Sequence, residues 1–163
     1  MRQLFSIVFT AVFISLAPAP TARAEAADWN QWRGPNRDST TEESLPSTLN
    51  QNLEIQWQKP LGPSYSGPIV CDGLLYSTET VDKKTERVTA YNIDDGQQIW
   101  TAQWPGSMAV PFFAAANGDW IRATPACDGD SLLVMGIRDV LVCLDAKSGQ
   151  ERWRVDFPKS IGT

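Results

Sequence analysis

From about residue 66 onward, the chain alternates short apolar runs with tight polar turns. The apolar runs are too short for helices, and Asp-Gly or Ser-Gly pairs separate many of them. This pattern predicts two groups of four antiparallel strands. The expected strands span residues 68–70, 74–77, 87–91 and 97–102, and then residues 125–127, 131–135, 140–144 and 150–156.

The two groups are copies of one repeat. The segments AYNIDDGQQIW (90–100) and CLDAKSGQERW (143–153) share a frame of a small residue, Asn or Asp, a polar residue before Gly, and a closing Trp. Upstream, residues 67–79 and 124–136 share a Pro, a Cys-Asp-Gly turn and an apolar run in the same order. Four short strands with glycine turns in each repeat are typical of a β-propeller blade. Trp57 resembles the end of a further repeat.

Each position of the frame has a physical role in a hairpin. The short polar side chains hydrogen-bond to the turn backbone, and the glycine accepts a positive φ angle. The small residue leaves room for the tryptophan ring, which we expect to pack between blades. The equivalent pairs are Ala90 and Cys143, Asn92 and Asp145, Asp95 and Ser148, Gly96 and Gly149, and Trp100 and Trp153.

This frame resembles the tryptophan-docking repeat of pyrroloquinoline-quinone-like (PQQ-like) β-propellers. That family includes quinoprotein dehydrogenases and the barrel-assembly lipoprotein of the bacterial outer membrane. The stretch DWNQWRGPNRDS (28–39) also resembles the opening of exported bacterial propellers of this family. The fold class we expect is therefore all-β, with blades of four antiparallel strands.

Closed rings in this family have about seven or eight blades and need roughly 300 residues or more. The sequence of 163 residues holds about two blades and one partial strand. We therefore expect it to be the N-terminal part of a longer protein or a truncated reading frame. A third blade is expected to begin at 159–163. The predicted organisation is a signal peptide at 1–24, an extension at 25–50 and a partial propeller at 51–163, with blade one at about 66–106 and blade two at about 123–158.

The first residues have the layout of a secretory signal peptide. Arg2 precedes an apolar run from residue 4 to residue 17, and small residues at Ala22 and Ala24 mark a cleavage site. The run is shorter than the roughly 20 residues of a membrane span, and the first cysteine, Cys71, is too late for a lipid anchor. The sequence thus predicts a periplasmic or secreted protein without a membrane anchor.

Charge excludes some partners. The net charge is −5, and removal of Arg2 and Arg23 with the leader would leave about −7. Nucleic acids and anionic membrane surfaces are poor partners for such a chain.

No catalytic, cofactor-binding or metal-binding residue can be assigned from the sequence. The resemblance implies that a dehydrogenase of this family would need PQQ, calcium and an aspartate base, from blades that the sequence does not contain. With no histidine and no C-x-x-C pair, a zinc site is not expected. The odd number of cysteines allows at most one internal disulfide, and we favour small buried core residues for Cys71, Cys127 and Cys143.

Three further features have two interpretations each. A set of four aspartates fits turn formation better than a calcium site. The connection at 104–122 carries unusual apolar side chains, which form either a locally packed patch or a surface for a partner. The aromatic and arginine cluster near the start is either a structural tether, which we favour, or a binding anchor. The residues are Asp94, Asp95, Asp128 and Asp130 in the first feature, Trp104, Met108, Phe112, Phe113 and Trp120 in the second, and Trp29, Trp32 and Arg33 in the third.

The leading functional hypothesis is an exported, non-enzymatic propeller that scaffolds protein or cell-envelope polymer partners, without a cofactor. The alternative is a non-catalytic N-terminal portion of a PQQ-dependent quinoprotein oxidoreductase, and only this alternative calls for PQQ and calcium. A third expectation is self-association, because two blades leave open strand edges and an uncovered tryptophan surface.

Overall fold

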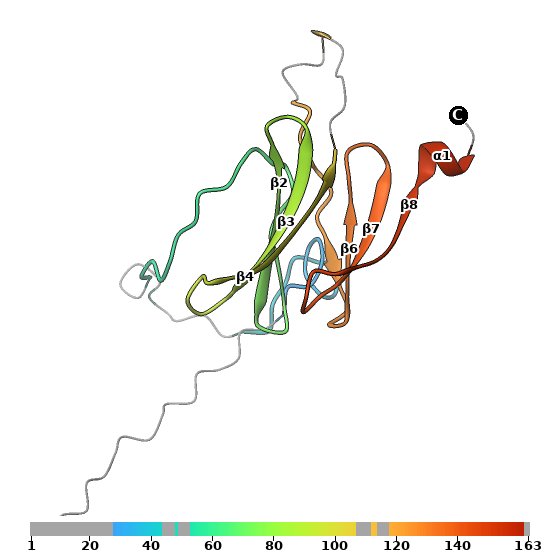
Figure 1. Cartoon of the computed structure of the whole chain (residues 1–163). Coiled ribbons are helices and arrows are strands. Elements are labelled where there is room, and N and C mark those ends of the chain that lie inside the picture. Colours follow the sequence, from blue (N-terminus) through green and yellow to red (C-terminus); the bar gives the residue numbers. More distant parts are fainter. Residues whose placement is uncertain (1–27, 44–47, 49–52, 107–111, 114–117, 162–163) are drawn as a thin grey trace, which may run out of the picture.

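Two antiparallel sheets lie side by side in the protein (Figure 1). The structure is a computed structural model that describes residues 28–43, 48, 53–106, 112–113 and 118–161. The predicted signal peptide at 1–24 lies outside the described residues. No helix among the described residues is long and apolar enough to cross a membrane.

Each sheet is a four-stranded meander in which neighbouring strands follow one another in sequence. The expected all-β blades are therefore confirmed. The first sheet has the order β1-β2-β3-β4 and the second the order β5-β6-β7-β8. The strands are β1 (Ile69–Cys71), β2 (Leu74–Val81), β3 (Thr85–Asn92), β4 (Gln98–Pro105), β5 (Ala126–Cys127), β6 (Ser131–Met135), β7 (Val140–Asp145) and β8 (Glu151–Asp156).

The β2–β3 hairpin is longer than the sequence pattern indicates. We expected β2 to end at Ser77 and β3 to begin at Arg87, but the ladder continues to the pair Val81 and Thr85. The added residues are mostly polar, yet several are buried, including Thr78, Thr80 and Glu86. Apolar periodicity cannot detect strands whose buried face is polar.

The hairpin turns of the two sheets are equivalent in detail. In the first sheet the Gly96 amide donates to the Asn92 carbonyl at 2.9 Å, and in the second the Gly149 amide donates to the Asp145 carbonyl at 2.8 Å. Both glycines have positive φ angles, 68° and 71°. A register shift follows the small residue of the frame in both sheets, after Ala90 and after Cys143. The repeat seen in the sequence is therefore a structural repeat.

Tryptophan rings join one repeat to the next. Trp100 at the end of the first frame lies against the turn of the second sheet, and its Nε1 donates to the Ala146 carbonyl at 2.9 Å. The ring lies so close to Gly149 that an added Cβ would come within 2.4 Å of it. Trp57 takes the same position on the first sheet, where its Nε1 donates to the Ile93 carbonyl at 2.8 Å. The expected packing between blades is thus confirmed for Trp100.

Trp153, the tryptophan of the second frame, is 46% exposed. The described residues include no turn that covers its ring as the turn at Gly149 covers Trp100.

The core lies between the facing sheets. It draws on β1 to β4 from one side and on β5 to β7 and the β7–β8 turn from the other, with one residue from the connection between the sheets. Its largest fully buried members are Tyr76, Ile69, Ile121, Leu132, Leu144, Val88, Val134 and Val142.

The last described element is a short helix, α1 (Phe157–Ile161), where we expected a new blade to begin. Asp156 ends β8 and starts this helix. Its carboxylate accepts from the Lys159 amide at 3.4 Å, and its carbonyl accepts from the Ser160 hydroxyl at 2.8 Å. These are the local bonds by which an aspartate caps a helix start. The start of a third blade near this position stays a prediction.

Candidate functional site between the two blades

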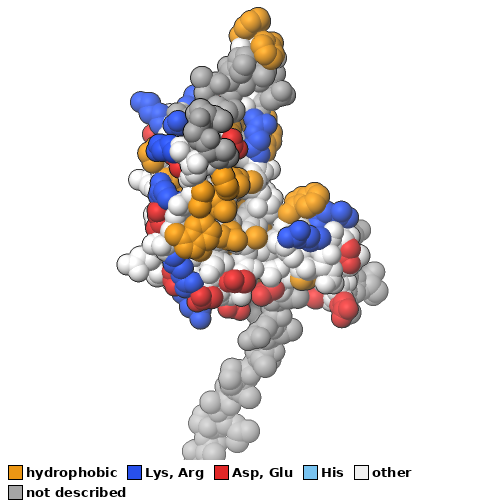
Figure 2. Space-filling view, turned by 90° about the vertical axis from the view of Figure 1, so that its right-hand side faces the viewer, with side chains coloured by type: hydrophobic (Ala, Val, Ile, Leu, Met, Phe, Trp, Pro, Cys, Tyr) orange, Lys and Arg blue, Asp and Glu red, His pale blue; other side chains and the backbone are white. Residues whose placement is uncertain are grey.

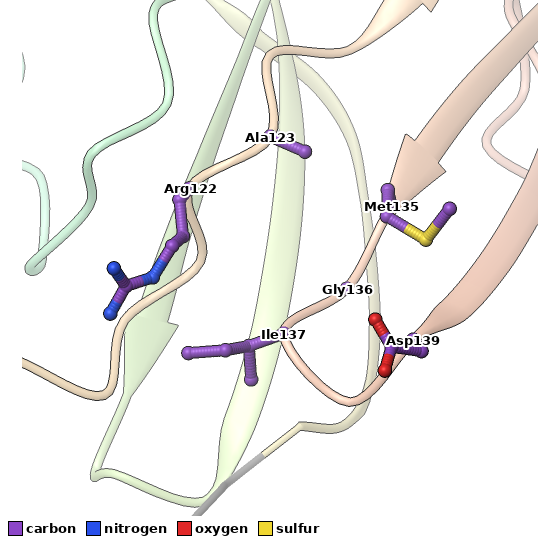
Figure 3. A pocket seen from close by; sticks show the side chains of 6 residues that line it. All are labelled: Arg122, Ala123, Met135, Gly136, Ile137 and Asp139. Carbon is purple, nitrogen blue, oxygen red and sulfur yellow. The ribbon is translucent and has the colours of Figure 1, made fainter. Parts of the chain in front are cut away.

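An open cleft of about 450 Å³ lies between the inter-blade connection and the β6–β7 turn (Figure 3). Arg122 and Ala123 form the connection side, and Met135, Gly136, Ile137 and Asp139 form the turn side. In Figure 3 the Ile137 side chain points toward the connection, between Arg122 and Asp139. The two charged side chains therefore lie on opposite walls, with an apolar residue between them.

A buried carboxylate supports the turn side of this cleft. Glu86, on β3, is 1% exposed. One carboxylate oxygen accepts from Trp104 Nε1 at 2.8 Å, and the other accepts from the Ile137 amide at 2.7 Å. Burial raises the pKa of Glu86, although its hydrogen bonds to Ile137 and Trp104 oppose the change. Glu86 thus holds the β6–β7 turn of one blade from within the other.

Two glycines make room for this carboxylate. A Cβ at Gly106 or at Gly136 would come within 2.3 Å of Glu86 side-chain atoms. Sequence analysis did not identify Glu86, because a lone Glu within a polar run gives no signal. Gly136, which directly follows β6, belongs to the repeated segment 124–136, but the sequence pattern indicates no role for it.

The connection between the blades combines both interpretations of its apolar residues. Trp104 and Ile121 are buried, at 3% and 0% exposure. The Ile121 amide donates to Thr80 Oγ1 at 3.0 Å, and Trp120 packs against Tyr65 with ring centroids 5.1 Å apart. The Arg122 guanidinium lies over the Tyr65 ring, 5.5 Å from its centroid. Local packing therefore describes both flanks of the connection.

The middle of the connection is different. Phe112 is 91% exposed and Phe113 is 78% exposed. Their rings pack edge to face on each other, with centroids 5.7 Å apart. Both lie beyond the end of the sheets, on the side of the β6–β7 turn (Figure 1), and hydrophobic side chains occupy the same tip in Figure 2. Met108 lies outside the described residues. The surface interpretation therefore fits Phe112 and Phe113.

The segment before the first blade is a tether, as we favoured. Trp29 exchanges two backbone hydrogen bonds with Val70 of β1, at 2.9 and 3.0 Å. Asn30 accepts from the Cys127 amide of β5 at 2.9 Å. This segment therefore joins the first strands of both blades. Trp32 is nevertheless 63% exposed, with the Arg33 guanidinium 5.4 Å from its ring centroid.

The aspartates of the turns bind backbone amides. Asp95 accepts from the Gln97 amide at 2.8 Å, and Asp128 accepts from the amides of Asp130 and Ser131 at 3.0 and 2.7 Å. These bonds lower the pKa of Asp128. The turn-forming role predicted for Asp95 and Asp128 is thus observed.

Asp130 forms an ion pair with Arg152 at 2.6 Å. That hydrogen bond lowers the pKa of Asp130. Among the described residues, no three Asp, Glu, Cys or His side chains gather in a way that could hold a metal ion.

All three cysteines are free thiols and buried, which confirms their interpretation as core residues. Cys71 and Cys127 belong to the shared core between the sheets. Cys143 is 2% exposed and pairs across the ladder with Trp153.

Comparisons with known proteins give a family and several distant structural neighbours. Residues 84–163 match the family model described as outer membrane protein assembly factor BamB. No curated protein matches the chain.

Among solved structures, a europium-containing methanol dehydrogenase matches with a TM-score of 0.42 at 19% identity, over 60% of this chain and 16% of its own. BamB from Moraxella catarrhalis matches with a TM-score of 0.39 at 16% identity, over 56% of this chain and 24% of its own. A quinohemoprotein alcohol dehydrogenase from Comamonas testosteroni matches with a TM-score of 0.42 at 23% identity, over 61% and 14%. This chain thus spans at most 24% of the length of these three structures.

The family match starts at the end of the β2–β3 turn and includes both tryptophan frames. Both frames lie in four-stranded meanders with equivalent turns and register shifts. On these grounds residues 84–163, about half of the chain, belong to the PQQ-like β-propeller repeat family.

Proposed function

We propose that this chain is part of an exported, non-enzymatic propeller that scaffolds a partner protein through the connection between its two blades. The observation that carries this proposal is the exposed pair Phe112 and Phe113, at 91% and 78% exposure. Aromatic side chains are enriched where proteins bind one another, because they bring a large apolar area at a small entropic cost. The match to a family described as an outer membrane assembly factor supports a protein as the partner.

The chemistry of the buried carboxylates also favours a scaffold. Glu86 uses both carboxylate oxygens to accept hydrogen bonds from Trp104 and Ile137. Glu79 is paired with Arg87 at 2.6 Å and accepts from the Gly62 amide at 2.5 Å. A general base needs an oxygen aimed at a substrate, and both of these buried groups instead accept hydrogen bonds from other residues of the protein.

Site-specific photocrosslinking tests the proposed surface. A photoreactive residue at position 112 of the full chain should give a protein adduct in a Gram-negative bacterium that expresses it. The same residue at Ile99, which is exposed on β4 at 46%, is the matched control and should give none. The substitution Phe113→Ala should reduce the adduct at position 112, because the two rings form one apolar surface.

Equal crosslinking at positions 112 and 99 would contradict this surface. The alternative of a quinoprotein oxidoreductase portion predicts a different result. The reading frame should then continue past Thr163 into further blades, and PQQ added with calcium should quench the tryptophan fluorescence of that longer protein in a saturable way. Such binding would overturn the proposal.

Export is a separate part of the proposal. Cleavage after Ala24 predicts a mature protein that begins at Glu25 and lies in the periplasm or the medium. N-terminal sequencing measures the cleavage site, and cell fractionation measures the location of the mature protein. The substitution Ala24→Arg should leave the precursor uncut, whereas Glu25→Gln, one residue further along, should be processed normally.

A further inference from the structure

We propose that Cys71 and Cys127 are a covalent modification site, at which a disulfide joins the first strands of the two blades. Cys71 is the last residue of β1, and Cys127 is the last residue of β5. Each precedes an Asp-Gly turn, so the two residues hold the same position in successive repeats. The repeat alone does not bring them together, since equivalent positions of two blades need not touch.

The turns that follow the two cysteines lie against each other, since a Cβ added at Gly129 would come 3.2 Å from Asp72 Oδ2. Each thiol also lies near enough to the other to shift its pKa, beside the larger effect of burial. The Gly129 amide donates to Cys127 Sγ at 3.3 Å. Both cysteines are buried in the core cluster between the sheets, at 1% and 6% exposure.

Backbone contacts hold the two strand ends beside each other. The tether at 28–30 pairs with β1 through Trp29 and Val70, and with β5 through Asn30 and Cys127. Asn30 also donates from Nδ2 to the Cys127 carbonyl at 3.1 Å. A disulfide needs Cα atoms within about 7 Å and side chains that point toward each other. Strands held by one shared tether, with both cysteines in one core cluster, need little movement to reach this geometry.

The reaction is thiol–disulfide exchange with a small disulfide such as oxidised glutathione. One cysteine loses its proton and attacks the glutathione disulfide, which releases one glutathione thiol and leaves a mixed disulfide. The other cysteine then loses its proton and attacks the protein sulfur of the mixed disulfide. A second glutathione thiol leaves as the Cys71–Cys127 bond forms. Two thiols of the protein are oxidised, and one glutathione disulfide is reduced to two thiols.

The reaction should be slow under native conditions and faster at higher pH. Burial raises the pKa of both thiols, and it outweighs the lowering effect of Cys71 on Cys127, while Cys127 raises the pKa of Cys71 further. Little thiolate is therefore present near neutral pH. Access runs through the turns that follow the two cysteines, where Asp72, Gly73 and Asp128 are exposed.

The test is a thiol count on the full chain after native incubation with oxidised glutathione, followed by non-reducing peptide mapping. The count should fall from the three free cysteines to one. The mapped bridge should join Cys71 to Cys127. Cys71→Ser and Cys127→Ser should each keep both remaining thiols, whereas Cys143→Ser, the matched control, should lose both of its thiols. Alanine variants at Cys71 and Cys127 repeat the test if a serine hydroxyl disturbs the core.

Melting temperature provides a second measurement. Oxidation should raise the melting temperature of the unsubstituted chain and of Cys143→Ser, because the bridge restricts the unfolded state. It should not change that of Cys127→Ala. Three results would each overturn the proposal: retention of all three thiols, a bridge that includes Cys143, or a bridge between two chains.

Discussion

Glycine at the turn of each tryptophan frame adopts a positive φ angle and also leaves room for a tryptophan ring. A pair of substitutions separates these two roles. Gly149 and Gly73 have almost the same positive φ angle, 71° and 73°. An added Cβ at Gly149 would lie 2.4 Å from the Trp100 ring, whereas at Gly73 it would meet nothing within 4 Å. Asn tolerates a positive φ better than most residues. The variants Gly149→Asn and Gly73→Asn therefore share the backbone cost and differ in the steric cost.

The expected losses follow from these distances. The left-handed backbone costs both variants about 1 kcal/mol. Gly149→Asn must also displace the Trp100 ring, and overpacking of this kind costs about 1–3 kcal/mol more. It would disturb the hydrogen bond from Trp100 Nε1 to the Ala146 carbonyl as well. We expect Gly149→Asn to lower the free energy of unfolding by about 2–4 kcal/mol in all.

Urea unfolding followed by tryptophan fluorescence measures both variants against the unsubstituted chain. The emission of folded Gly149→Asn should also shift to longer wavelength, because its Trp100 ring moves toward solvent. Gly73→Asn should keep the original emission. Equal losses of stability in the two variants would refute the reasoning, because they would mean that only the backbone angle requires glycine.

Other substitutions test the contacts between the blades. Trp100→Ala should lower the free energy of unfolding by about 3–5 kcal/mol in urea, and Trp153→Ala should lower it much less, because Trp153 is 46% exposed. Trp153→Ser should also weaken the predicted self-association, as measured by sedimentation velocity. The pKa of Glu86 is raised by burial in the folded state, so its contribution is full below the unfolded pKa and declines as pH rises through the folded pKa. Glu86→Gln cannot titrate, and its stability deficit in urea should therefore be largest near about pH 4 and shrink toward about pH 8. The pKa of Asp145 is lowered to about 2, chiefly by its hydrogen bond with Arg152, and Arg152→Gln should raise it in an NMR titration of the carboxyl carbon.

Turn chemistry allowed the hairpins to be predicted from the sequence. In both frames, the polar side chain and the glycine act within a few residues of each other. Asn92 accepts from the Asp94 amide at 2.8 Å, and Asp145 accepts from the Ser148 amide at 2.9 Å. Contacts of this range are fixed by neighbouring residues, so a local pattern is sufficient to identify them.

The polar core residues could not be predicted, because their partners are distant in sequence. Thr80 accepts from an amide 41 residues away, and Glu86 accepts from an amide 51 residues away. Without these partners, a Thr or a Glu in a strand is expected to face water. The lengths of β2 and β3, and the cleft that Glu86 supports, depend on these distant bonds.

The connection at 104–122 was recognised as unusual, but its division into packed and exposed parts was not. Trp104 and Phe112 look alike in the sequence. Trp104 is buried because Glu86 accepts its indole hydrogen bond, and no described residue holds the Phe112 ring except Phe113. Hydrophobicity alone predicts the same degree of burial for Trp104 and Phe112. Only the position of a packing partner explains why one is buried and the other exposed.

Contacts between the two blades involve equivalent positions of the repeat, so the repeat predicts the packing of the blades as well as the strands within each blade. Tyr76 and Trp100 both donate to the Ala146 carbonyl, from 70 and 46 residues away. The first blade therefore buries two of its large aromatic side chains on the second, as expected for a structure built from stacked repeats. The equivalent face of the second blade carries Leu133 and Trp153, which are 37% and 46% exposed. The second blade thus presents to solvent the counterpart of the surface with which the first blade holds it. Self-association through it is an expectation of the same packing rule that stabilises the interface.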